Sequence, residues 1–254
     1  MLERFDKSMV RKKGLAGPIR LEAETLRFIS ANTTIPVPHV YNLWEAQDGK
    51  EASFTMNWIE GQPLGKVWRK ISLEQRRSVM PTLGGFVEQL RAVCQQFPPG
   101  WIGSLFGDAS YDMQIFPSDL FGPFTNEKTY NDWRISTFSR FATASAPTAA
   151  RLQKIWKNMP DNHHIYFTHG DISLFNVLVR VEGEEPDDVP VVALLDWEQA
   201  GWRPEFWEAE KMLYGMGDII DWVRLVKEEI FPGSDYDDDI RREGALLLIS
   251  GPPR

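Results

Sequence analysis

The chain has 254 residues, of which 43% are hydrophobic and 25% are charged, and its formal net charge is −8 at pH 7. Its single cysteine, Cys94, excludes an intrachain disulfide and a cysteine-based zinc site. No apolar run approaches the ~20 residues that span a bilayer, and the charged first residues lack the apolar core of a signal peptide. We therefore expect a globular cytoplasmic protein of one or two domains, without membrane contact.

The acidic excess lies in one part of the chain. Residues 1–60 contain 8 basic and 8 acidic residues, whereas residues 61–254 contain 20 basic and 28 acidic residues. An acidic surface repels nucleic acid and attracts cationic small molecules. We expect no nucleic-acid partner and favour a cationic small-molecule partner, although a generic acidic surface explains the charge equally well.

The first sixty residues predict a small unit of strands and one helix. Residues 9–13 alternate weakly, as at the end of a strand, with Val10 and Lys12 on one face. Pro18 begins a predicted helix that runs to residue 32. The proline-containing stretch 33–44 leads into a strand, and after the turn at Asp48-Gly49, residues 51–61 form another.

The following residues predict a larger and mainly helical part. Ser72 and Gln75 form a capping box before a helix with a regular apolar stripe, which indicates core packing. Residues 97–141 are rich in aromatic side chains, and proline and glycine divide their first half into loops. Residues 143–150 have small side chains that indicate a linker or the start of a helix.

The stretch from Tyr166 to Trp197 contains two apolar runs, 177–179 and 189–195, which flank an acidic turn. This pattern predicts an antiparallel hairpin with a long connection. Asn176 immediately precedes the first arm and Asp196 immediately follows the second, so pairing of the arms brings these two residues together. Asp171 lies five residues before Asn176, in a loop that passes the same end of the hairpin.

Three oxygen-bearing side chains are thus expected at one place. Carboxylate and amide oxygens are hard ligands that suit magnesium better than zinc. Phosphoryl transfer needs such an arrangement, because its catalysis consists mainly of positioning and of charge neutralisation by metal. Each residue alone could end a strand or cap a turn, but their joint spacing favours a phosphoryl-transfer site.

The motif His169-Gly170-Asp171, four residues, then Asn176, together with Leu-Asp-Trp-Glu around Asp196, resembles the catalytic loops of the aminoglycoside phosphotransferase family. The resemblance implies a two-lobed protein-kinase-like α+β fold, with a small β-rich N-terminal lobe and a larger helical lobe that carries the catalytic hairpin. It implies that Asp171 orients and deprotonates an acceptor hydroxyl, while Asn176 and Asp196 hold Mg²⁺. Gly170 replaces the arginine of protein kinases, and Trp197-Glu198 replace Phe-Gly, which argues against a protein substrate.

The same resemblance implies the residues that bind ATP. Lys12 matches the lysine that contacts the phosphates, with Lys13 as its competitor, and Glu24 matches the glutamate that pairs with this lysine. Glu22 lies roughly 200° around the helix from Glu24, so only one of them faces inward. The backbone of Asn57, Trp58 and Ile59 would bind adenine at a hinge, with lobe boundaries at 1–60 and 61–254. Glu208 would be a buried structural acid, and His169 would organise the catalytic loop.

The small lobe is expected to be incomplete. The resemblance implies two strands and a phosphate-covering loop before the lysine strand, but only eleven residues precede Lys12. We therefore expect that the natural sequence continues upstream and that residues 1–254 alone bind ATP poorly. The predicted activity is ATP-dependent phosphorylation of a hydroxyl on an aminoglycoside-like or other amine-bearing alcohol. The alternative is a pseudoenzyme or binding module that lacks turnover, and the oligomeric state is not predicted.

Overall fold

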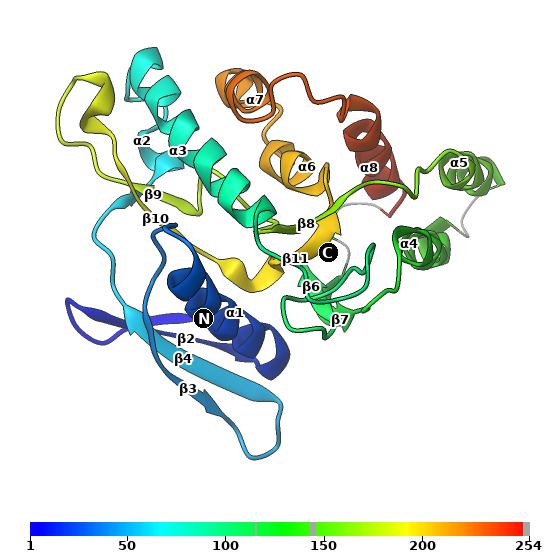
Figure 1. The fold of residues 1–254 in the computed structure, drawn as a ribbon, viewed down its shortest axis with the longest axis horizontal. Helices are drawn as coiled ribbons and strands as arrows, with labels where there is room; N and C mark the ends of the chain where they lie inside the picture. Colours follow the sequence, from blue (N-terminus) through cyan, green and yellow to red (C-terminus); the bar gives the residue numbers. More distant parts are fainter. Residues whose placement is uncertain (115, 143–145, 251–254) are drawn as a thin grey trace.

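The computed structural model describes residues 1–114, 116–142 and 146–250. A small sheet with one helix lies against a larger, mostly helical part (Figure 1). One hydrophobic core runs through both parts, from Val10 in the sheet to Phe231 near the C-terminus. This mixed α+β architecture confirms the predicted fold class. None of the helices in the described ranges combines the length and the apolar character needed to cross a membrane.

The N-terminal part is a four-stranded antiparallel sheet with the strand order β1-β2-β4-β3. Its strands are β1 (Leu2–Arg4), β2 (Met9–Leu15), β3 (Val40–Glu45) and β4 (Glu51–Asn57), and helix α1 (Ala16–Asn32) packs against them. The predicted strands and helix are present. Strand β1 was not predicted, and its Leu2 pairs with Lys12 of β2.

The C-terminal part contains the remaining elements. They are β5 (Gln62–Pro63), α2 (Leu64–Val67), α3 (Leu73–Arg91), β6 (Ser110–Asp112), β7 (Phe116–Phe121), α4 (Glu127–Ala142), α5 (Ala146–Lys157), β8 (Ile165–Thr168), β9 (Val177–Val179), the 3₁₀ helix η1 (Pro186–Asp188), β10 (Val191–Leu194), the 3₁₀ helix η2 (Trp197–Gln199), β11 (Gly201–Pro204), α6 (Trp207–Leu213), α7 (Ile220–Leu225), the π-helical turn η3 (Val226–Ile230) and α8 (Asp237–Ser250).

Local sequence signals explain the ends of several of these elements. Ser72 caps α3 by accepting from the Gln75 backbone N–H, while the Gln75 side chain accepts from the Ser72 backbone N–H, so the predicted capping box is present. Of the predicted small-residue segment, residues 143–145 lie outside the described residues, and residues 146–150 begin α5. Helices α4, α5 and α8 pack together around Phe138, Leu152 and Leu246.

The central hairpin has the predicted antiparallel register. Val177 pairs with Leu194 and Val179 pairs with Val191, with a register shift between Val191 and Ala193. The Leu195 N–H donates to the Asn176 carbonyl at 2.9 Å, which closes the open end of the hairpin. Strand β8 pairs with β11, so the loop after β8 lies beside the chain that follows β10. The register therefore brings segments 169–176 and 195–199 together.

Candidate active site

One buried acid, Glu208, binds the backbone of the loop that follows β8. Glu208 of α6 accepts from the backbone N–H of His169 at 2.6 Å and from that of Gly170 at 3.2 Å. Gly170 has φ +77°, and a Cβ at this position would lie 2.9 Å from the Gln199 carbonyl oxygen. Both the backbone conformation and the close approach require glycine. Burial raises the pKa of Glu208 to about 7, and the two backbone donors oppose this effect.

His169 connects this loop to the end of the hairpin. Its Nδ1 accepts from the Asp171 backbone N–H at 3.1 Å, and its Nε2 lies 3.0 Å from the Leu195 carbonyl oxygen. Because Nδ1 accepts a hydrogen bond, Nε2 carries the proton and donates to Leu195. Burial lowers the pKa of His169 to about 4, so the ring is neutral near pH 7. These contacts organise the loop, as the sequence predicted.

Asp171 and Asn176 form a directly bonded pair. The Asn176 Nδ2 donates to Asp171 Oδ2 at 2.8 Å and to the Asp171 carbonyl at 3.0 Å. With the amide nitrogen so engaged, the Asn176 Oδ1 is the atom available to a cation. Burial raises the pKa of Asp171 to about 6, although the nearby charge of Lys211 lowers it. A carboxylate with this pKa is mostly ionised at pH 7 and able to accept a proton.

Asp196 immediately follows β10 in a left-handed backbone conformation, with φ 67° and ψ 65°. A non-glycine residue with positive φ is uncommon and costs energy, and such residues concentrate at functional sites. The conformation turns the chain into η2 directly after the strand. The Asp196 Oδ1 lies 2.5 Å from the Lys12 ammonium, so the hairpin end meets the small sheet at this residue.

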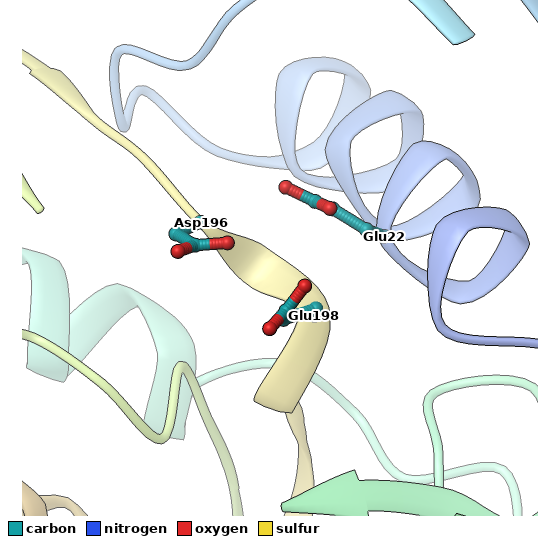
Figure 2. A group of neighbouring side chains, drawn as sticks. All are labelled: Glu22, Asp196 and Glu198. Atoms are coloured by element: carbon teal, nitrogen blue, oxygen red, sulfur yellow. The ribbon is translucent and has the colours of Figure 1, made fainter. Parts of the chain in front are cut away.

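Lys12 lies among three carboxylates that come from both parts of the molecule. Its Nζ is 2.6 Å from Glu22, 2.5 Å from Asp196 and 3.2 Å from Glu198. Figure 2 shows Glu22 reaching from α1 toward Asp196 and Glu198 at η2. Burial acts to lower the pKa of Lys12, but the charges of the three acids outweigh it and raise the pKa. One ammonium thus faces three acidic side chains.

The prediction that Glu24 pairs with the lysine is wrong in this structure. Glu22 makes the contact with Lys12 and is 2% exposed, while Glu24 is only partly buried and has no ion pair within the described part of the chain. Glu22 lies on the same helix stripe as Thr25, Leu26 and Ile29, all of them buried. This i, i+3, i+4, i+7 stripe was visible in the sequence and would have identified Glu22.

The strand alternation also separates the two candidate lysines. Successive side chains of a strand point to opposite faces. Val10 is buried and Lys12 follows it on the inner face of β2, whereas Lys13 is exposed. The structure therefore brings Lys12, and not Lys13, to the hairpin end.

The acidic oxygens at this place fit a divalent cation. One carboxylate oxygen each from Glu22, Asp196 and Glu198 lies within 4.8 Å of the others. Hard oxygen donors of this kind match the ligand preference of Mg²⁺. Glu22 and Glu198 were not among the predicted metal ligands.

The predicted hinge is the segment that leads from β4 to β5. Two of its backbone amides are already engaged: the Asn57 N–H donates to the His39 carbonyl at 3.2 Å, and the Trp58 N–H donates to the Ser8 carbonyl at 2.7 Å. Of the three predicted residues, only Ile59 has an amide without a hydrogen bond to another described residue. Asn57 and Trp58 therefore do not offer free N–H groups to adenine in this structure.

A pocket of about 370 Å³ opens beside Asp171. Sequence reasoning missed most of its wall, which includes Met113 and Gln114 after β6, Phe175 of the loop, Gln199 of η2, and Lys211, Tyr214, Gly215 and Met216 at the end of α6. No local motif marks Met113, Gln114 or the residues at the end of α6. A larger pocket of about 690 Å³ between α1 and α3 is lined mainly by apolar side chains, and it includes neither Asp171 nor Asp196.

A family model described as "phosphotransferase enzyme family" matches residues 9–226. The chain belongs to this family. The match covers the Lys12 strand, the Asp171 loop and the hairpin, and it confirms the resemblance that the motif suggested. The enzyme class, a phosphotransferase, is confirmed with it. No curated protein matches the chain's sequence.

Solved structures of aminoglycoside phosphotransferases share the fold. The GDP complex of aminoglycoside 2'-phosphotransferase-IIIa is 14% identical with a TM-score of 0.67, covering 98% of this chain and 78% of the other. An aminoglycoside-3'-phosphotransferase of type VIII is 17% identical with a TM-score of 0.58, over 96% and 85% of the two chains. APH(3'')-Id from Streptomyces rimosus ATCC10970, with ADP and streptomycin, is 15% identical with a TM-score of 0.55, over 96% and 87%. These likenesses confirm the kinase-like architecture.

Proposed function

We propose that this phosphotransferase moves the γ-phosphoryl group of ATP to a hydroxyl of a small molecule. The observation that carries the proposal is the pairing of Asp171 with Asn176 in the wall of a pocket, next to the hairpin end where Asp196 meets Lys12. A carboxylate at a pocket, acidic oxygens for metal and a lysine for phosphate are the parts that phosphoryl transfer requires.

Each residue has a role in the proposed reaction. Asp171 accepts the proton of the acceptor hydroxyl and orients its oxygen toward the phosphorus. Asn176 and Asp196 would hold Mg²⁺, and the Glu198 carboxylate lies close enough to that of Asp196 to join it. Bound Mg²⁺ supplies positive charge against the phosphate oxygens. Lys12, supported by Glu22, donates to a phosphate oxygen.

The nucleotide would lie between the two proposed lobes, residues 1–60 and 61–254. Two of the solved relatives are complexes with GDP or ADP, which supports a nucleotide donor. Because Asn57 and Trp58 use their amides within the small sheet, Ile59 is the proposed donor to the base.

The acceptor is proposed to be a small alcohol, as the kanamycin and streptomycin complexes of relatives suggest. The described pocket wall gives little support to a strongly cationic acceptor. Its charged members are Asp171 and Lys211, and the rest includes amides, hydroxyls and the apolar Phe175 and Met216. Cationic attraction would therefore come from the overall charge of −8 and not from the pocket wall itself.

The proposal is tested with the purified chain, magnesium, γ-labelled ATP and a panel of amine-bearing, uncharged and carboxylate-bearing alcohols. We expect labelled product with at least one alcohol, and a thermal shift with Mg·ATP. Absence of product together with absence of a shift would favour the pseudoenzyme alternative. Faster turnover of carboxylate-bearing alcohols at low salt would exclude a cationic acceptor.

A further inference from the structure

Gln199 connects Asp171 to the buried ion pair of Lys211 and Asp112. The Gln199 Oε1 accepts from the Met113 backbone N–H at 3.1 Å and from the Lys211 ammonium at 3.3 Å. The Gln199 Nε2 lies 3.4 Å from Asp171 Oδ2, at the long end of hydrogen-bond range. Gln199 is itself nearly buried, at 6% exposure.

The orientation of the Gln199 amide follows from its neighbours. Met113 N–H and Lys211 Nζ are donors only, so the group that faces them must be the amide oxygen. The opposite orientation would place the NH₂ group against these two donors. The buried donors would then lack acceptors, which costs free energy of folding. The NH₂ group of Gln199 must therefore face Asp171.

Lys211 is fixed in turn by Asp112. The Lys211 Nζ lies 2.8 Å from Asp112 Oδ1, and both side chains are buried, at 5% and 0% exposure. Asp112 Oδ1 also accepts from the Gln114 backbone N–H at 2.9 Å. A buried ion pair costs desolvation energy, and removing one partner leaves an uncompensated charge. The pair joins β6 to α6, and the β6 end and α6 both contact Gln199, so two elements other than its own fix its position.

These contacts make the two oxygens of the Asp171 carboxylate unequal. Oδ2 receives the Asn176 amide at 2.8 Å and the Gln199 amide at 3.4 Å. No described residue donates to Oδ1, and Asp171 lines the acceptor pocket. Two donors on one oxygen restrict the rotation of the carboxylate and leave the other oxygen for the substrate.

We propose that Gln199, held by the Lys211–Asp112 ion pair, is a positioning residue that keeps Asp171 Oδ1 turned toward the acceptor hydroxyl. The inference rests on the proposed function of Asp171. Catalytic geometry depends on such supporting contacts, because a small misplacement of the reacting group slows the chemical step more than it weakens binding.

Gln199→Glu is the sharpest variant. The glutamate still accepts from Met113 and Lys211, but it turns a carboxylate oxygen, not an amide donor, toward Asp171 Oδ2. We expect kcat to fall by about 10- to 100-fold, because a hydrogen bond to a charged group is lost. The KM for Mg·ATP should stay within about twofold, because Gln199 lines the pocket proposed for the acceptor.

Lys211 is tested by two substitutions. Lys211→Met removes the charge and leaves Asp112 buried without its partner, so we expect a similar fall in kcat and a lower melting temperature. Lys211→Arg keeps the charge and the donors and should recover much of the rate. Gln47→Glu, at an exposed position in the β3–β4 turn, is the matched control and should leave the kinetic parameters unchanged.

The assay measures transfer of the labelled γ-phosphoryl group from Mg·ATP, to water when no alcohol is added and to kanamycin when it is the added alcohol. A wild-type protein with no turnover, and equal to Asp171→Asn, would contradict the proposed function itself. An active wild type, an inactive Asp171→Asn and a fully active Gln199→Glu would overturn only the positioning role. A crystal structure of Gln199→Glu tests the geometry independently of turnover: we expect Asp171 to rotate away from its present orientation, and an unmoved carboxylate would overturn the inference.

Discussion

The two sides of the candidate site differ in how their charges are balanced. On the side proposed to bind the acceptor, two amide donors face the Asp171 Oδ2, and the nearby Lys211 is paired with Asp112. On the side proposed to bind phosphate, around Lys12 and the hairpin end, the single ammonium of Lys12 faces three carboxylates. The first side therefore has its charges paired and its donors directed, whereas the second carries an acidic excess that a cation would neutralise.

The largest effect is expected on the phosphate side, from Asp196→Ala. The change removes the residue that contributes both to the proposed metal site and to the contact with Lys12. We expect magnesium-dependent nucleotide binding to be lost, as measured by calorimetric titration with ATP at several magnesium concentrations. An unchanged magnesium dependence would exclude Asp196 as a metal ligand. Asp235→Asn, at an exposed position, is the control.

Lys12→Met should have the next largest effect. The Lys12 ammonium lies 2.5 Å from Asp196 at the hairpin end. A hydrogen bond from a charged donor contributes about 1.5–3 kcal/mol. We expect Mg·ATP to bind about 10- to 100-fold more weakly. The exposed Lys13 supplies the control, and Lys13→Met should bind the nucleotide as the wild type does. Equal losses in the two variants would contradict the assignment of Lys12.

Glu198→Gln tests the charge imbalance directly. The change removes one attraction to Lys12 and two repulsions, from Glu22 and Asp196. We expect the ligand-free protein to gain about 2–4 °C in melting temperature, which corresponds to roughly 1 kcal/mol in a chain of this size. Added magnesium should then stabilise the variant less than the wild type. A lower melting temperature in the absence of metal would contradict the imbalance.

A smaller, pH-dependent effect on stability is expected from His163, which lies outside the candidate site. His163 lies 2.7 Å from Glu127 and 3.5 Å from Asp239. Burial acts to lower the pKa of His163, but hydrogen bonds and charges of Asp239 and Glu127 outweigh it and raise the pKa to about 10. Since the unfolded pKa is about 6.5, the stabilisation is complete below that pH and disappears as the pH rises through about 10.

His163→Gln should therefore destabilise the protein by about 1–2 kcal/mol at pH 6, a value reduced for the partial exposure of the ring to solvent. The difference from the wild type should vanish above pH 10. Urea unfolding at pH 6, 8 and 10.5 measures it. A constant difference across this range would show that the ring contributes through packing and not through its charge.

The sequence was most informative where strand register determines the contacts. Pairing of β9 with β10 follows from two short apolar runs, and it alone brings Asn176 next to the end of β10. The same alternation along β2 separates Lys12 from Lys13. Glu24 was chosen over Glu22 by motif match, although the helix stripe with Thr25, Leu26 and Ile29 indicated the opposite.

The acceptor side was less predictable because its contacts join distant segments. The pair of Lys211 and Asp112 spans 99 residues, and the contact between Gln199 and Met113 spans 86. Gln199 directly follows the motif around Asp196, but its partners Met113 and Lys211 belong to no motif. The hydrogen bonds of the Asn57 and Trp58 amides could not be predicted either, because they depend on the positions of the Ser8 and His39 carbonyls in the folded chain.

The measurement that tests the central claim most directly compares Asp171→Asn with the wild type in two assays, phosphate transfer and Mg·ATP binding. The substitution keeps the size of the side chain and removes only the carboxylate that accepts the proton. The account predicts that transfer falls by about three orders of magnitude or more while the Kd of Mg·ATP stays within about twofold. Retained transfer, or a loss of nucleotide binding as large as the loss of transfer, would contradict the proposed role of Asp171.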